Sequence, residues 1–165
     1  MTPRSATPST GVSIRHLVRK DAAQLAERVR QVSEFLVNPN APDAWTLEDL
    51  EAWLLEEGEL CSGAFLHGTL VGFCLAHLHR ATCKLHIENI FVMQNYQRAR
   101  IAARLLSSTI DCAQRNCRRR MRVVALVRSA NEKAQAFFAN QGLQRGEAML
   151  WYQENLDSSD GPTLR

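Results

Sequence analysis

The spacing of apolar and polar residues along this chain changes near residue 60. Before it, the helical spacing of apolar residues predicts helices at residues 21–34 and 46–58. Thr46 followed by Asp49 is typical of a capped helix start. After it, longer runs rich in β-branched and aromatic residues predict strands that form an antiparallel meander. The strands of this meander cover residues 60–67, 70–79 and 84–93, and a further strand at residues 12–18 precedes the first helix.

The second half of the chain predicts a crossover between two strands. An amphipathic helix at residues 99–116 separates the strand at 84–93 from a strand at 122–128, so these two strands should run parallel. Such a pair opens where the helix begins, and ligands bind at splayed strand ends of this kind. A helix at residues 131–141 and a strand at 148–153 follow. The expected fold class is α/β (α+β), with a mixed, mostly antiparallel sheet flanked by helices.

Composition indicates one globular domain, because 165 residues with 45% hydrophobic and 22% charged side chains can bury a sizeable core. Residues 1–11 and 156–165 are rich in turn-forming and small polar residues, so we expect disordered tails and a single domain at 12–155. Five cysteines without a CxxC pair favour reduced thiols in the cytoplasm. No apolar run reaches the roughly 18 residues of a membrane span, so we expect a soluble protein without a membrane partner.

Three histidines lie on neighbouring predicted strands, at His77, His79 and His86. A metal site there is conceivable. However, no carboxylate or thiol spacing supplies a further ligand, so partly exposed strand histidines are the favoured interpretation. We expect no metal.

Charge is distributed unevenly along the chain. Residues 42–59 carry seven acidic side chains and no basic one, whereas nine arginines lie between Arg98 and Arg128, opposed only by Asp111. Both runs can be solvated helix faces, or they can form an acidic surface for a cationic substrate and a basic one for an anionic cofactor. The run CRRR at residues 117–120 raises nucleic-acid binding as a third possibility, but no aromatic residues accompany it, so we expect no nucleic-acid partner.

The entry to the helix after residue 97 has the properties of an anion site. The first N–H groups of a helix have no partner within it and carry the positive end of the helix dipole. Arg98 and Arg100 add charge that can bind phosphate oxygens. Exposed arginines with no ligand are the alternative, since a first-turn cation is tolerated on a surface.

Two blocks of this sequence resemble the core of the GNAT superfamily of N-acetyltransferases. They are LHIENIFVMQNYQRARIAARLL and VALVRSANEKAQAFFANQGL, which include Tyr96-Gln97 and the pattern Asn131-x-x-Ala134-x-x-Phe137-Phe138-x-x-x-Gly142-Leu143. Within the superfamily, HIENIFVMQNY is most similar to diamine acetyltransferases of the spermidine/spermine type. The resemblance implies the GNAT fold, acetyl-CoA as cosubstrate and transfer of acetyl to a primary amine, which can belong to a small amine, a polyamine or a peptide. It also implies a homodimer.

The same resemblance implies roles for individual residues. Glu88 matches the carboxylate that helps deprotonate the incoming amine, a necessary step because an alkylammonium has a pKa of about 10.4. An ordinary polar residue on a half-exposed strand is the alternative for Glu88. Asn131 should lie near the pantetheine arm of the cofactor and can cap the following helix. The backbone expected to hold acetyl-CoA is that of Ile90, Phe91, Val92, Gln97, Arg98, Ala99, Arg100, Ile101, Ala102 and Ala103.

Two residues depart from the family pattern. Arg100 stands where the loop usually has glycine, whose missing side chain lets the backbone approach the pyrophosphate. Phe138 stands where many members have a tyrosine that protonates the leaving thiolate, and phenylalanine has no proton to give. Tyr152 is a conceivable substitute, but a tyrosine that stacks on the sheet edge is the favoured interpretation. These departures define an alternative function, a catalytically impaired GNAT-fold module that binds CoA or another partner.

Overall fold

The computed structural model describes residues 11–36 and 45–147, with side chains omitted for 32–36. The chain divides into two compact units, Met1–Asn131 and Glu132–Arg165. The predicted tails and the predicted strand at 148–153, with Tyr152, lie outside the described residues.

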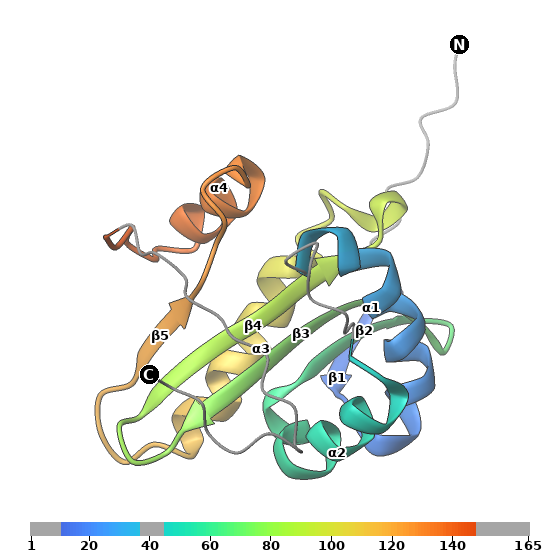
Figure 1. Cartoon of the computed structure of the whole chain (residues 1–165), viewed down its shortest axis with the longest axis horizontal. Coiled ribbons are helices and arrows are strands. Elements are labelled where there is room, and N and C mark those ends of the chain that lie inside the picture. Colours follow the sequence, from blue (N-terminus) through green and yellow to red (C-terminus); the bar gives the residue numbers. More distant parts are fainter. Residues whose placement is uncertain (1–10, 37–44, 148–165) are drawn as a thin grey trace, which may run out of the picture. The chain divides into compact units, whose positions relative to one another are not determined.

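One mixed sheet of five strands organises the first unit (Figure 1). Its spatial order β1-β2-β3-β4-β5 follows the order of the chain. The first four strands pair antiparallel, and β4 and β5 pair parallel from Lys84↔Arg122 to Ile87↔Ala125. This arrangement confirms the predicted fold class and crossover. The strands are β1 (Ser13–His16), β2 (Ser62–Leu66), β3 (Thr69–His79), β4 (Lys84–Val92) and β5 (Arg122–Ala125).

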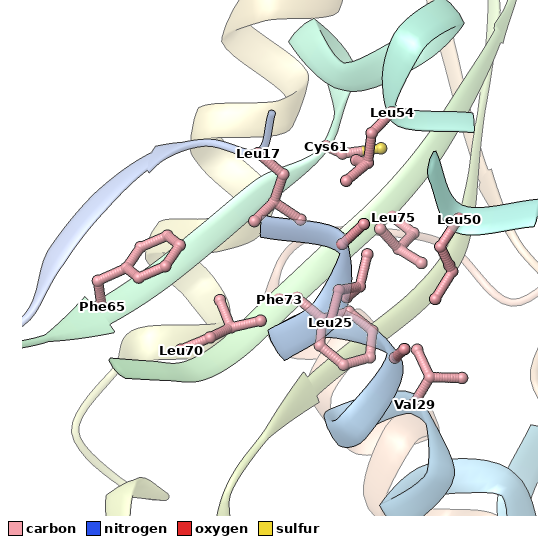
Figure 2. Packing of buried hydrophobic residues seen from close by; sticks show 12 residues of the cluster. Leu17, Leu25, Val29, Leu50, Leu54, Cys61, Phe65, Leu70, Phe73 and Leu75 are labelled. Carbon is pink, nitrogen blue, oxygen red and sulfur yellow. The ribbon is translucent and has the colours of Figure 1, made fainter. Parts of the chain in front are cut away.

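Helices cover both faces of the sheet. In Figure 1, α1 (Ala22–Leu36) and α2 (Leu47–Glu57) lie in front of it, and α3 (Ile101–Arg115) passes behind. The main core fills the space between the sheet and the first two helices, because α1 and α2 each turn an apolar stripe toward β3. Figure 2 shows this core from close by, with Leu17, Leu25, Val29, Leu50, Leu54, Cys61, Phe65, Leu70, Phe73 and Leu75 labelled.

The helix on the other face is also buried along one side. Ile101, Leu105 and Leu106 are buried on α3. Thr109 is fully buried one turn further on, where its hydroxyl lies 2.9 Å from that of Ser62 on β2. Because each hydroxyl satisfies the other, α3 is held in register with the sheet without an unpaired polar group.

Short elements connect these layers as the sequence predicts. Thr46 caps α2: its Oγ1 accepts from Asp49 N at 3.1 Å, and its own N–H donates to Asp49 Oδ2 at 2.8 Å. This reciprocal pair confirms the predicted capping signature. The connections within the described residues also include the 3₁₀ turns η1 (Arg19–Asp21), η2 (Gly58–Leu60) and η3 (Gln94–Tyr96).

Among the boundaries that differ from the prediction, two lie next to the parallel strand pair. β5 ends at Ala125 rather than at residue 128, because its pairing with β4 stops at Ile87↔Ala125. α3 begins at Ile101 rather than at residue 99, because Arg98 and Arg100 both have left-handed backbone angles. In the second unit, α4 (Glu132–Asn140) forms close to the predicted place and ends before Gly142, which has φ +84°. Within the described residues, no helix is long and apolar enough to cross a membrane.

A buried carboxylate ties β1 to the start of α1. Asp21 accepts from both terminal nitrogens of Arg15, at 2.6 and 2.7 Å, and from Val18 N at 3.0 Å. The guanidinium of Arg15 also lies 3.8 Å from the centroid of the Phe65 ring. Burial alone would raise the pKa of Asp21, but the hydrogen bonds from Arg15 and Val18 outweigh it and hold the pKa below its ordinary value.

We expect the Asp21→Asn variant to lower the free energy of unfolding at pH 7 by about 2 kcal/mol, because a charge-assisted pair is lost. A carboxyl with a depressed folded-state pKa stabilises the protein above its unfolded pKa and loses that effect as the pH falls through its folded pKa. The difference between variant and wild type should therefore stay constant from pH 7 to about pH 5 and shrink as the pH falls further, through the ordinary carboxyl pKa and below it, measured by urea denaturation. Glu51→Gln, which breaks the exposed Arg19–Glu51 pair of 2.7 Å, is the matched control and should change stability by less than about 0.5 kcal/mol.

Candidate active site

Glu88 lies at an irregular point of β4. The pairing with β3 jumps from Ala76↔Ile87 to Leu75↔Asn89, so Glu88 has no partner across the strand pair. Buried residues alternate with less buried ones from Lys84 to Glu88, where the side chain is exposed, and the alternation stops at Asn89, which is half-buried. A bulge of this kind turns a side chain out of the regular pleat, and bulges are frequent next to active sites. Glu88 is therefore presented as an accessible carboxylate rather than as part of a regular sheet face.

Beyond this bulge, β4 has an open edge. β5 pairs with β4 only as far as Ile87, while β4 continues to Val92. Within the described part of the chain, residues 89–92 thus have a strand partner on the β3 side alone. The Phe91 carbonyl faces that partner, since a Cβ added at Gly72 would lie 2.8 Å from it. An extended ligand arm can pair with a free strand edge as an added strand does.

The loop between β4 and α3 has an unusual backbone. Arg98 has φ +66° and Arg100 has φ +56°, and both side chains are exposed. A non-glycine residue in this region costs roughly 1–2 kcal/mol. Turns that include left-handed residues direct successive N–H groups toward one point and form anion-binding concavities. The arginine at position 100 therefore adopts the backbone conformation that glycine would take most easily there.

The first turn of α3 adds further donors to this loop. Arg104 N donates to Arg100 O at 3.1 Å, which is the first hydrogen bond of the helix. The N–H groups of Ile101, Ala102 and Ala103 precede it and have no partner inside the helix. No acidic residue lies in this first turn, so the positive end of the helix dipole is not neutralised there. The structure thus assembles the predicted loop residues into one cradle suited to an anion.

Gln97 has a structural part in the cradle. Its side-chain Nε2 donates to Val92 O at 3.0 Å, and its backbone N–H donates to Gln94 O at 3.2 Å. The side chain therefore links the end of β4 to the start of the loop. It also occupies the Val92 carbonyl, which leaves that group less available to a ligand. The role of Gln97 as a direct cofactor contact stays a prediction.

The remaining predicted residues lie further along the chain. Asn131 ends the first unit, where its backbone N–H donates to Arg128 O at 2.9 Å. α4 begins at the next residue and belongs to the second unit. Phe138 is buried on α4, with its ring centroid 5.1 Å from that of Phe137. A place for Asn131 or Phe138 at the cofactor stays a prediction.

The strand histidines have partners that are not metal ligands of one site. His77 Nδ1 lies 3.1 Å from Glu57 Oε1, and His79 Nδ1 lies 2.7 Å from Thr82 Oγ1. His86 is paired with His77 across β3 and β4. In the described ranges, His, Cys, Asp and Glu side chains form no group of three that could hold a metal ion.

Solved structures share this fold. AAC(6')-Iy, an aminoglycoside N-acetyltransferase solved with the bisubstrate analogue CoA-S-monomethyl-acetylneamine, matches 89% of this chain and 100% of its own, with TM-score 0.70 and 18% identity. PaiA N-acetyltransferase from Thermoplasma acidophilum, solved with coenzyme A, matches 85% and 94%, with TM-score 0.70 and 18% identity. Ribosomal-protein-alanine N-acetyltransferase from Brucella melitensis matches 88% and 100%, with TM-score 0.67 and 18% identity. At this identity the likeness shows the fold, which is that of the N-acetyltransferases.

The family follows from the sequence itself. The model of the acetyltransferase (GNAT) family matches residues 26–143, which is most of the chain. No curated protein matches the sequence as a relative. The chain belongs to the acetyltransferase (GNAT) family and is an acetyl-CoA-dependent N-acyltransferase.

We expect the Arg100→Gly variant to raise the free energy of unfolding by about 0.5–1 kcal/mol. The strain of a left-handed non-glycine residue, about 1–2 kcal/mol, exceeds the entropy cost of glycine, about 0.5–1 kcal/mol. Urea denaturation at constant m-value measures the change. Arg118→Gly is the matched control, because Arg118 is exposed but has no left-handed backbone angle, and it should be neutral or destabilising. A loss of stability in Arg100→Gly would contradict the assignment of strain to this residue.

Proposed function

We propose that this acetyltransferase transfers acetyl from acetyl-CoA directly to a primary amine, with Glu88 as the proton acceptor. The observation that carries the proposal is the position of Glu88. The bulge exposes it at the point where β4 loses its β5 partner, on the strand that leads into the anion cradle. A cofactor arm along the open edge would bring its thioester toward this carboxylate.

The cofactor would be held by backbone groups. The pyrophosphate fits the cradle formed by residues 98–103, where unpaired N–H groups, the helix dipole and two arginines all favour an anion. The pantetheine arm fits the open edge at residues 90–92. Together these contacts would hold the thioester in one orientation for attack. Support for acetyl-CoA comes also from the neighbours, which were solved with coenzyme A or a CoA analogue.

The chemistry needs a base because the acceptor arrives as an ammonium with a pKa of about 10.4. Glu88 would take one proton, directly or through a water molecule, and leave the nitrogen lone pair free. The nitrogen then attacks the thioester carbonyl, the N–C bond forms, and the C–S bond breaks as the CoA thiolate leaves. The proton lost from nitrogen can return to the thiolate through solvent, so the reaction balances without a covalent enzyme intermediate.

A cationic acceptor is favoured by charge. Among the acidic side chains near α2, Glu48, Glu56 and Glu59 are exposed. Glu51 and Glu57 instead pair with Arg19 and His77. The exposed carboxylates suit a polyamine, a diamine or a basic peptide. The neighbours include an aminoglycoside and a ribosomal-protein-alanine acetyltransferase, both of which act on amines.

The test is a screen of the purified full chain with acetyl-CoA against diamines, polyamines, aminoglycosides and basic peptides, read by mass spectrometry of the acceptor. We expect acetylation of at least one cationic amine, suppressed by competition with unlabelled polyamine. Tight binding of acetyl-CoA with no acetylated product in any class would instead establish the impaired CoA-binding module, which Arg100 and Phe138 together motivate. The free cysteines suit a reducing compartment such as the cytoplasm, where we propose that the protein acts. We also propose that it acts as a homodimer, as the family resemblance implies.

We expect Phe138→Tyr to raise kcat roughly tenfold, less than the 10²–10⁴ of an aligned general acid, because the ring is already packed against Phe137. The new hydroxyl would supply the proton that phenylalanine lacks. Steady-state kinetics on the best acceptor measures the change, with Phe137→Tyr as the adjacent control. An equal gain in both variants would contradict the placement of position 138 at the leaving group.

A further inference from the structure

Two loops meet at the end of β4 that lies opposite to the cradle (Figure 1). One is the turn between β3 and β4, and the other is the connection between α3 and β5. Arg122 N donates to Cys83 O at 2.9 Å, just before the first parallel pair of β4 and β5. The guanidinium of Arg119 donates to Ala81 O and so links the same two loops. The fold therefore joins two segments that are far apart in the sequence.

These segments bring six basic side chains to one end of the sheet. Five of them are exposed arginines and one is a half-buried lysine. We call this group the basic end, and it consists of Arg80, Lys84, Arg118, Arg119, Arg120 and Arg122. The run CRRR supplies three of these residues, and the fold adds the others, since Lys84 on β4 pairs directly with Arg122 on β5. The cluster therefore depends on the topology as well as on the local sequence.

No counter-charge accompanies the basic end. Neither residues 78–87 nor residues 112–128 contain an aspartate or a glutamate. Elsewhere arginines pair with carboxylates, as in Arg15–Asp21, but within the described ranges no cation of the basic end has an acidic partner. Because the whole chain has a net charge of only +3, the remainder of the chain is net negative. The positive potential is thus concentrated at this end, where it attracts anions.

The side chains of the basic end favour phosphate as the anion. A guanidinium presents a planar fork of donors that fits phosphate oxygens, and five of the six cations are arginines. No aromatic residue lies within residues 78–87 or 112–128, so unpaired bases would find no stacking partner there. None of the exposed large apolar side chains of the described residues belongs to the basic end. It therefore lacks an anchor for a lipid layer or for the centre of a protein interface, and it suits a regular array of phosphates.

We propose that the basic end binds double-stranded RNA through its phosphate backbone, without preference for base sequence. An A-form helix has a narrow major groove, across which the phosphates of both strands lie close enough for one compact cluster of cations to contact them. The major groove of B-form DNA is about 12 Å wide and separates these phosphates further. The sequence alone predicted no nucleic-acid partner because no aromatic residues accompany residues 117–120, but a paired helix presents phosphates rather than base faces.

RNA and acetyl-CoA should bind independently, because the nine residues of β4 separate the basic end from the cradle by roughly 25 Å, at about 3.3 Å per residue. The test is fluorescence anisotropy of the full chain, under reducing conditions, with a labelled RNA duplex of about 20 base pairs. We expect a micromolar dissociation constant at about 50 mM salt, and a slope of about −3 to −4 when the logarithm of the association constant is plotted against that of the salt concentration. Saturating acetyl-CoA and a change of base sequence should both leave the affinity unchanged.

Matched double variants separate the basic end from the net charge of the chain. Arg118→Glu with Arg120→Glu should weaken RNA binding at least about tenfold and make the salt slope shallower by about 2. Lys20→Glu with Arg145→Glu changes the net charge equally at exposed residues outside the basic end and should bind like wild type, with folding of both verified by circular dichroism. Absent RNA binding, equal losses in both variants, or displacement of the RNA by acetyl-CoA would overturn the proposal. So would equal or tighter binding to a DNA duplex, to polyglutamate or to phosphatidylserine vesicles.

Discussion

Replacing Glu88 with glutamine should lower kcat by about 10²–10⁴-fold, the usual contribution of a general base. Glutamine has nearly the same size and cannot take a proton from the ammonium. Because the bulge presents an exposed side chain, the substitution should leave folding and acetyl-CoA binding unchanged. Steady-state kinetics on the best acceptor, with calorimetric binding of acetyl-CoA alongside, separates the two effects.

The pH profile provides the sharper readout. The deficit of Glu88→Gln should shrink as the pH approaches the acceptor's own pKa, about 10.4 for an alkylamine, because the amine then loses its proton without help. Glu51→Gln serves as a control, because Glu51 pairs with Arg19 on the surface and should leave the profile unchanged. A deficit that is the same at every pH would mean that Glu88 positions the acceptor rather than accepts its proton.

The second large effect concerns the cradle. Arg100→Glu should weaken acetyl-CoA binding by about 10–100-fold, or roughly 1.4–2.7 kcal/mol, because an acidic side chain would then lie beside the pyrophosphate. The effect should become smaller at high salt, since the side chain at position 100 is exposed and its charge is screened. Isothermal titration calorimetry at two salt concentrations measures both the loss and its salt dependence.

Arg118→Glu provides the matched control for this charge reversal. Arg118 is exposed and lies beyond the end of α3, far along the helix from the cradle. The Arg118→Glu substitution changes the net charge by the same amount as Arg100→Glu, so any general electrostatic effect on binding appears in both variants. Equal losses of affinity in the two variants would contradict a phosphate site at residues 98–103. A loss confined to Arg100→Glu would support it.

The strands and helices could be predicted from sequence because their buried residues follow regular patterns. β3 shows a run of buried residues that ends at the exposed His77 and His79, and the core residues of α1 and α2 recur at helical spacing. Patterns of this kind depend on local sequence and on one neighbouring layer. The crossover was also predictable, because two strands joined through an amphipathic helix have few possible connections within one sheet.

The finer features of the site depend on contacts that local patterns do not contain. The bulge at Glu88 arises from how β4 pairs with β3, and the early end of β5 arises from where β4 and β5 part. The only local signal was the polar Glu88-Asn89 step inside an apolar run. Arginine is also a poor predictor of a left-handed turn, so the backbone at Arg98 and Arg100 could not be inferred from residue type.

The left-handed arginine at position 100 has a consequence for the thermodynamics of binding. An arginine backbone samples fewer conformations than a glycine backbone, so a loop already held at φ +56° has less freedom to lose when a cofactor arrives. Arg100→Gly should therefore make the protein more stable and yet make the entropy of acetyl-CoA binding less favourable. A glycine loop favours binding because its backbone can approach the cofactor closely. This loop would favour binding because its conformation is already fixed before the cofactor arrives.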